Sequence, residues 1–260
     1  MQNEPTVVLG VIDAVGLTTL EFLLGKFNGE ITLPNLAQMG LGNLLEPRFN
    51  DRIPRSTTAD LAVAVEQSSP SADSVIGHRE IAGVTTKETY DLFYQGFPVD
   101  YIVELERRIG RKTIFNKRSG GDDAIKQNRN AHETSSDHPI IVYASICDPL
   151  IQLAAHENFV DPKKLAKYAD MAFELAMEKG VRITRAISRP YVIEDGKIKR
   201  TGRRHDKVQQ LEEPTLIDVC REQGIWTVSV GKPADLVNTG WDSITKITDD
   251  RFLDPSLKLG

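Results

Sequence analysis

A short segment near residue 80 combines side-chain types that could support phosphoryl transfer. Asp73 and Ser74 are followed by Gly77 and His78, and Asp13 stands at the end of the first apolar run. A hydroxyl beside an acid, together with a second carboxylate, is what metal-assisted phosphoryl transfer requires. An Asp-Ser pair is more often the N-cap of a helix, because both side chains can accept hydrogen bonds from free backbone amides. Taken alone, the pair favours the capping role.

Asp13 follows an apolar run rich in β-branched residues. Residues 6–12 predict a strand buried on both faces of a parallel sheet. In open α/β sheets ligands bind at the carboxyl ends of the strands, so a carboxylate there is a candidate site residue. An Asx turn in the loop that begins at Ala14 explains Asp13 equally well. From this residue alone the two interpretations stay level.

The composition predicts a folded protein without a strong overall field. The chain has 260 residues, with 32 Lys and Arg against 37 Asp and Glu and a formal net charge of −5. An anionic substrate must therefore be met by local Arg and Lys, and we expect no nucleic-acid or membrane partner. The two cysteines, Cys147 and Cys220, favour a reducing compartment. Because we find no signal peptide and no apolar run of membrane-spanning length, we expect a cytoplasmic protein.

The order of predicted elements indicates an α/β core interrupted by an inserted α/β cap. We expect residues 1–98 and 214–260 to form the core around one mainly parallel sheet, shared by strands at 6–12 and 225–230. Residues 99–213 would form the cap.

Several elements of the predicted cap have local signals. Asp161, Pro162 and Gly180 predict the capped start and the end of a helix that runs to Lys179. Glu194-Asp195-Gly196 favours a hairpin turn between two short strands. The remaining expectations are strands at 140–146 and 181–188, a polar loop at 111–137 and, after the cap, a helix at 214–223.

Short motifs along nearly the whole chain resemble, in the same order, those of the phosphopentomutases. These enzymes of the alkaline phosphatase superfamily interconvert ribose 1-phosphate and ribose 5-phosphate. The matching segments are Val11-Ile12-Asp13, Leu33-Pro34-Asn35-Leu36, residues 73–83, Gly96-Phe97-Pro98, Asn116-Lys117, residues 141–148 and 152–157, Arg189-Pro190-Tyr191, residues 200–206, Pro214-Thr215, and Gly231-Lys232 with Asp235. Their order makes the resemblance specific, although each tripeptide alone is a weak signal. The resemblance implies an alkaline-phosphatase-like core.

The resemblance also implies a catalytic role for Ser74 and a metal-binding role for Asp13. Ser74 stands at the position of the threonine that carries the phosphoryl group, and both residues would be ligands of divalent metals, typically two Mn²⁺. A sugar bisphosphate would act as activator. Serine keeps the nucleophilic oxygen but lacks the methyl group that stiffens threonine, so the site would be less rigid.

Further matches imply contacts to a pentose phosphate substrate. Asp148, Arg189, Arg204 and Lys232 match positions that contact the sugar hydroxyls and the phosphate. Ser145 is the weaker match, because one extra residue separates it from Asp148. Guanidinium groups suit phosphate oxygens, and a carboxylate suits hydroxyl donors. The alternative for the two arginines is a solvated surface charge. We expect them to face one another across a sheet.

The metal-binding pattern of the phosphopentomutases continues beyond the region matched here. An Asp and a His a few residues apart, an Asp-His pair and a further His have no counterpart in this sequence, so we expect an incomplete core. Three explanations remain open. The chain is a fragment of an active enzyme, or its other half is a separate polypeptide, or it is a relative that binds sugar phosphates without turnover. The first requires the fewest assumptions.

Overall fold

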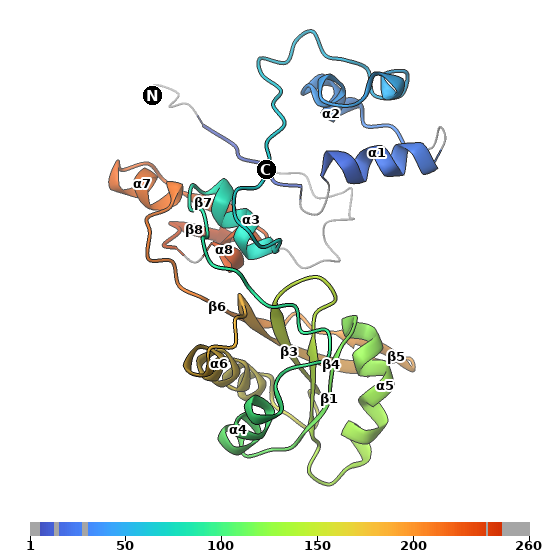
Figure 1. Ribbon diagram of the computed structural model, residues 1–260, viewed down its shortest axis with the longest axis vertical. Helices are drawn as coiled ribbons and strands as arrows, with labels where there is room; N and C mark the ends of the chain where they lie inside the picture. Colours follow the sequence, from blue (N-terminus) through green and yellow to red (C-terminus); the bar gives the residue numbers. More distant parts are fainter. Residues whose placement is uncertain (1–5, 13–15, 28–30, 238, 246–260) are drawn as a thin grey trace. The chain divides into compact units, whose positions relative to one another are not determined.

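The computed structural model describes residues 6–12, 16–27, 31–237 and 239–245, and the chain divides into two compact units, residues 1–66 and 67–260 (Figure 1). The first unit contains α1 (Leu17–Lys26), α2 (Pro34–Gln38) and two short 3-10 helices, Leu41–Asn43 and Pro47–Phe49. Its small apolar core consists of Leu20, Leu24, Ala37, Leu45, Phe49 and Ile53. The Leu33-Pro34-Asn35-Leu36 motif therefore lies at and within α2.

The prediction of a strand at residues 6–12 is wrong. These residues form no strand, and the side chains of Val7, Val8 and Leu9 are exposed. A strand requires a neighbour to pair its backbone groups, and none of the described residues pairs with this run. The expected sheet shared with residues 225–230 is wrong for the same reason.

The second unit is built on a mixed six-stranded sheet in the order β1-β2-β3-β4-β5, with β6 also paired to β4. Its strands are β1 (Thr113–Arg118), β2 (Ile140–Ala144), β3 (Leu150–His156), β4 (Arg185–Glu194), β5 (Lys197–Arg200) and β6 (His205–Val208). The pairs β1–β2 and β3–β4 are parallel, and the other pairs are antiparallel. The expectation of an α/β fold is confirmed.

Helices cover both faces of this sheet (Figure 1). On one face α4 (Val99–Ile109) and α6 (Pro162–Lys179) pack on alternate residues of β2 and β3, including Val142 and Leu153. On the other face α5 (Gly121–Thr134) packs on the intervening residues, including Ile141 and Tyr143. This period of two follows from the opposite directions of successive side chains along a strand.

The local signals of the cap gave correct elements. The α6 helix begins after Asp161, whose carboxylate accepts the amides of Lys163 and Lys164, and it ends at Gly180 with a φ of 68°. The β4–β5 hairpin turns at Asp195 and Gly196, both with positive φ. The strand expected at 181–188 is shifted, since β4 starts at Arg185.

The polar loop expected at residues 111–137 is wrong. This stretch forms β1 and α5. The strand pattern is interrupted by a bulge, where Phe115 and Asn116 both have positive φ. The Asn116 side chain also bonds the backbone N–H and C=O of Phe97, at 2.9 and 3.0 Å. Two motifs of the resemblance, Gly96-Phe97-Pro98 and Asn116-Lys117, are therefore in contact.

The remaining elements of the second unit are α3 (Ser74–Ile81), α7 (Leu216–Glu222), β7 (Val228–Val230), α8 (Pro233–Leu236) and β8 (Ser243–Thr245). The helix expected at 214–223 is thus present in shorter form, capped by Thr215. The strand expected at 225–230 is present as β7, which pairs in parallel with β8. Val75, Val208 and Leu236 form a small apolar cluster that holds α3 and α8 against β6.

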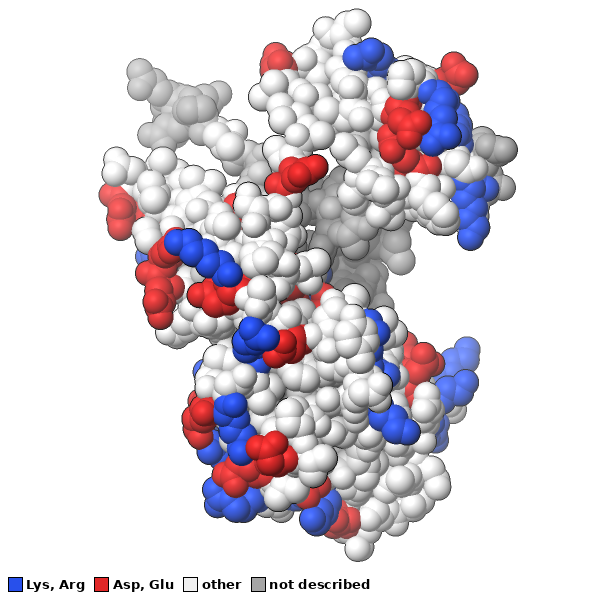
Figure 2. Space-filling view, viewed as in Figure 1, with Lys and Arg blue, Asp and Glu red and all other residues white. Residues whose placement is uncertain are grey.

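Positive and negative side chains are interspersed on the surface. On the face seen in Figure 2, Lys and Arg lie beside Asp and Glu on the second unit instead of forming a field of one sign. Of the helices in the described part of the chain, none has the length and apolarity needed to cross a membrane.

Candidate functional site

The site is built around the start of α3. Asp73 is the N-cap of this helix, and its Oδ1 accepts the backbone N–H groups of Val75 at 2.6 Å and Ile76 at 3.4 Å. The capping role that the Asp-Ser pair suggested is thus confirmed. Ser74 occupies the first helical position, and its carbonyl accepts a bond of 2.7 Å from Nδ1 of His78. Cap and histidine together fix the turn that carries the Ser74 hydroxyl.

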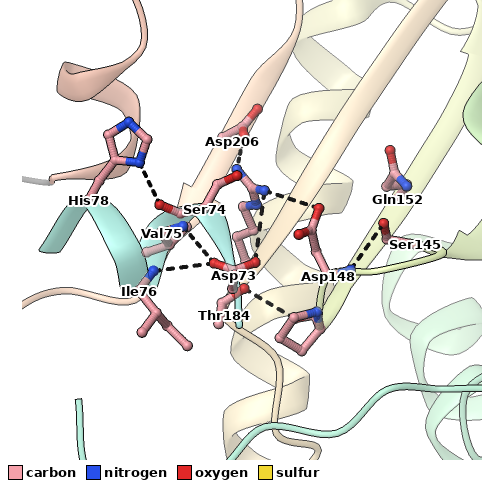
Figure 3. A network of polar contacts seen from close by, with 12 residues as sticks. Asp73, Ser74, Val75, Ile76, His78, Ser145, Asp148, Gln152, Thr184 and Asp206 are labelled. Atoms are coloured by element: carbon pink, nitrogen blue, oxygen red, sulfur yellow. Dashed lines mark hydrogen bonds and ion pairs between the residues drawn. The ribbon is translucent and has the colours of Figure 1, made fainter. Parts of the chain in front are cut away.

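The second oxygen of Asp73 faces the sheet. Asp73 Oδ2 lies 3.9 Å from Nη2 of Arg185, the first residue of β4 (Figure 3). The same nitrogen lies 3.6 Å from Asp148 Oδ2, and Arg185 Nη1 lies 3.7 Å from Asp206 Oδ2. The Arg185 side chain is only 5% exposed. Three carboxylates from three separate segments therefore converge on one buried guanidinium.

Burial dominates the electrostatics of Asp73. Desolvation raises the pKa of its carboxyl above the ordinary value, and the nearby Asp148 carboxylate acts in the same direction. The Arg185 guanidinium and the bonds from Val75 and Ile76 oppose this shift of the pKa. The start of α3 is therefore a site where negative charge is already concentrated, and Arg185 is the cation that balances it.

Asp148 and Ser145 lie in the turn between β2 and β3. The backbone N–H of Asp148 donates to Ser145 Oγ at 3.4 Å, so the two side chains share one turn (Figure 3). The Asp148 side chain is 26% exposed, in contrast to the buried Arg185 beside it. One side of this carboxylate is thus tied to the network, while the other is open to solvent or ligand.

Arg189 and Arg204 lie next to each other at the end of the β4–β6 ladder. The register pairs Ser188 with His205, which puts the two flanking arginines side by side. Burial lowers the pKa of Arg189 to about 10, and the adjacent charge of Arg204 contributes to this decrease. Arg189 Nε donates to Gln152 Oε1 at 3.0 Å, and Arg204 forms a two-point ion pair with Asp206.

Through Asp206 these arginines connect to the network at α3. Asp206 contacts both Arg204 and Arg185, and Arg185 contacts Asp73 and Asp148. Residues that are far apart in the sequence, 73, 148 and 204, therefore belong to one chain of ionic contacts. Gln152, which also accepts a bond of 3.2 Å from the Tyr143 hydroxyl, orients Arg189 beside them.

Two further predicted site residues are Lys232 and Asp13. Lys232 is exposed and immediately precedes α8, which packs against α3 through Val75 and Leu236. Asp13 lies outside the described residues, so its role as a metal ligand stays a prediction. In the portions of the chain that the structure describes, no group of three or more His, Cys, Asp or Glu side chains could hold a metal ion.

Sequence reasoning missed Arg185, the residue at the centre of the network. The signal was present, because Arg185 stands in the otherwise apolar and small sequence Ile183-Thr184-Arg185-Ala186-Ile187. An arginine in a fully buried strand must be matched by carboxylates, since an unpaired buried charge is costly. A buried arginine therefore indicates Asp or Glu partners without identifying them.

Comparison with known proteins agrees with the motifs. The chain is 38% identical over 247 residues to phosphopentomutases of Thermotoga petrophila and Thermotoga maritima, an alignment that covers 88% of this chain. It is 32% identical over 213 residues to the phosphopentomutase of Desulfitobacterium hafniense. The chain is a homologue of phosphopentomutases. It spans 61% of the length of the Thermotoga phosphopentomutases and 53% of the D. hafniense one. No model of a protein family matches it.

Proposed function

We propose that this chain provides the substrate-binding and nucleophile segments of a phosphopentomutase-type isomerase. Such an enzyme moves phosphate between C1 and C5 of ribose or deoxyribose. The observation that carries the proposal is the ionic network around Arg185. Arg185 contacts Asp148 and also Asp73, the residue before Ser74. Asp206 contacts both Arg185 and Arg204. This network supports the proposal, because it connects the proposed nucleophile segment with Asp148 and Arg204.

Each proposed role follows from the chemistry of the side chain. The Ser74 oxygen would carry the phosphoryl group, donate it to one sugar hydroxyl and accept it back from the other position, so that the sugar bisphosphate is the species between the two transfers. Asp148, with its open side, would accept bonds from sugar hydroxyls. Arg189 and Arg204 would bind the phosphate, because guanidinium groups bind phosphate oxygens in pairs. Lys232 and Ser145 remain proposed substrate contacts.

Arg189 remains charged at neutral pH in spite of burial. Its pKa is lowered to about 10, well above 7, so the guanidinium keeps its proton when a phosphate dianion approaches. Arg204 pairs with Asp206, which also acts on Arg189. The two adjacent guanidinium groups would together attract a phosphate dianion.

Two Mn²⁺ ions and a sugar bisphosphate activator belong to the proposal for the longer enzyme. The donor groups in the described residues do not fit a two-metal centre, since no group of three or more suitable side chains occurs among them. Asp13 and Ser74 stay the proposed ligands from this chain, and the bound metals would offset charge on the phosphoryl group. A separate polypeptide that carries the other ligands is one proposed partner, and the proposed location is the cytoplasm.

The same donor set favours a second candidate, a sugar-phosphate-binding protein without turnover. Two measurements on the 260-residue chain separate the candidates. Turnover of ribose 5-phosphate is assayed with Mn²⁺ and a sugar bisphosphate, and binding of ribose 5-phosphate is titrated by calorimetry. We expect binding without measurable turnover by this chain alone, because metal and electrostatic stabilisation supply most of the rate of phosphoryl transfer. Robust turnover would contradict the metal argument.

The binding titration includes Arg204→Ala and, as matched control, Arg203→Ala. Arg203 is the exposed neighbour that pairs with Glu157 instead of Asp206. Loss of a charge-assisted contact to phosphate predicts a decrease of roughly tenfold or more in affinity for Arg204→Ala. The control should bind like the wild type. Equal affinity of both variants would refute the assignment of the phosphate site.

A further inference from the structure

Arg185 is a buried arginine of the second unit whose polar atoms are poorly satisfied. Its Nε and Nη1 atoms are buried without a hydrogen-bond partner, and so is Asp73 Oδ2. The three carboxylates stand 3.6 to 3.9 Å from its nitrogens, within ion-pair range but beyond the best hydrogen-bond length. An arrangement that served stability alone would be expected to close these contacts, since buried charges are costly unless well paired.

The three carboxylates around Arg185 come from segments with different tasks. Asp73 caps α3 and fixes Ser74, and Asp148 belongs to the turn after β2. Asp206 holds Arg204. Asp73, Asp148 and Asp206, labelled in Figure 3, come from different segments, and each contacts the Arg185 guanidinium. Arg185 thus connects the proposed nucleophile segment with the turn that carries Asp148.

We propose that Arg185 is a positioning residue that holds the Asp148 carboxylate in register with the Asp73-capped start of α3, so that one pentose phosphate can meet both. The proposal rests on the proposed function of the site. Arg185 itself is buried and does not need to touch the sugar. It acts through Asp148, whose exposed side receives the hydroxyls while its other side is fixed by Arg185.

This role predicts selective effects on two different ligands. Ribose 5-phosphate carries hydroxyl groups for Asp148 and a phosphate for Arg189 and Arg204, whereas inorganic phosphate uses only the second set. Loss of the Arg185 fork should therefore weaken binding of ribose 5-phosphate and leave inorganic phosphate nearly unchanged. A purely structural role of Arg185 would weaken both ligands together.

The test uses Arg185→Lys, which keeps the positive charge and loses the planar fork that reaches several carboxylates at once. We expect roughly tenfold weaker binding of ribose 5-phosphate by calorimetry, with the affinity for inorganic phosphate within about twofold of wild type. The matched control is Arg182→Lys, three residues earlier in the chain, where an exposed arginine pairs with Asp91. The control should leave both affinities unchanged.

A double-variant comparison tests whether Arg185 acts through Asp148. In an Asp148→Asn background the further change Arg185→Lys should cost no additional ribose 5-phosphate affinity, because the positioned carboxylate is already gone. Additive losses would contradict the proposal. A readout on the wild type covers the case in which the lysine variant does not fold: the Nε–H resonance of Arg185 should shift with ribose 5-phosphate and not with inorganic phosphate.

The outcomes separate the two levels of the argument. If the wild-type chain binds ribose 5-phosphate, and Arg185→Lys binds it equally well or loses both ligands equally, the positioning role is wrong while the proposed function stands. The same conclusion follows if the Arg185 resonance responds identically to both ligands. If the wild type binds no ribose 5-phosphate, the proposed function is wrong and the positioning role falls with it.

Discussion

Replacement of Arg189 by Met should weaken phosphate binding without lowering the stability of the free chain. Burial and the adjacent charge of Arg204 lower the pKa of Arg189 from its ordinary value to about 10. This decrease corresponds to about 3 kcal/mol of unfavourable environment for the charged form, as an order of magnitude. Methionine removes that charge and keeps most of the apolar stem. In this variant Gln152 Oε1 loses the hydrogen bond from Arg189 but still accepts one from the Tyr143 hydroxyl.

The affinity for ribose 5-phosphate, in contrast to the stability, should decrease. A lost pair of charge-assisted bonds to phosphate costs about 1.5–3 kcal/mol, which is roughly a 10- to 150-fold weaker affinity for ribose 5-phosphate. Stability is measured by urea unfolding of the free chain, and affinity by calorimetry. A residue kept for function at the expense of stability shows this combination.

The control for this prediction is Arg182→Met, which removes an exposed arginine of the same unit that pairs with Asp91. It should leave the affinity unchanged. If Arg189→Met lowers the free energy of unfolding by more than about 1 kcal/mol and leaves the affinity intact, Arg189 is a structural residue and the reasoning is refuted.

Two further predictions concern residues outside the ionic network. Burial lowers the pKa of His132, whose Nδ1 bonds the Pro139 carbonyl and whose Nε2 accepts the His156 amide. As the pH falls below 6.5, the ordinary pKa of histidine, the unfolded chain therefore binds a proton that the folded chain does not. Urea unfolding at pH 7.5 and at pH 5 should show that the free energy of unfolding decreases by up to about 2 kcal/mol, and His132→Gln should reduce this decrease. Equal pH dependence in both proteins would contradict this prediction. Gly96→Ala should destabilise the chain by more than about 2 kcal/mol, since φ is +89° and the new Cβ would lie 2.1 Å from the Asn116 carbonyl oxygen. The control Gly224→Ala, at φ +72° with open space around the new Cβ, should cost only about 1 kcal/mol in thermal unfolding. Equal costs of the two variants would refute the role of the contact with Asn116.

The parts of the fold that the sequence predicted correctly are those with local causes. The α6 helix has Asp161 and Pro162 at its start and Gly180 at its end, and each acts on its own first or last turn. The Asp195-Gly196 hairpin likewise depends on two residues with positive φ. Such signals do not require knowledge of any distant segment.

The parts that the sequence did not predict depend on partners. Residues 6–12 have the composition of a buried strand, yet no described segment pairs with them. In β1 the bulge at Phe115 hides the alternation that marks a strand. In α5 the residues buried against the rest of the unit are only Ala124, Ile125 and His132. Long-range pairing and a narrow apolar face leave weak traces in a single sequence.

The candidate site shows the same division. The resemblance supplied Ser74, Asp148, Arg189 and Arg204, and their roles stay predictions. Arg185 has no motif of its own and became visible only when three carboxylates from distant segments were found around it. Its buried position is a property of the assembled sheet, since β4 is paired along both edges by β3 and β6.

The central claim is that the start of α3 and the sugar-phosphate contacts form one site, and an NMR titration of the labelled 260-residue chain with ribose 5-phosphate tests it most directly. We predict saturable shifts of the backbone amides at 73–76, 145–148, 189 and 204 with one common dissociation constant. Inorganic phosphate should shift the amides at 189 and 204 more strongly than those at 145–148. Shifts confined to one of these segments, or concentrated elsewhere in the second unit, would contradict the claim.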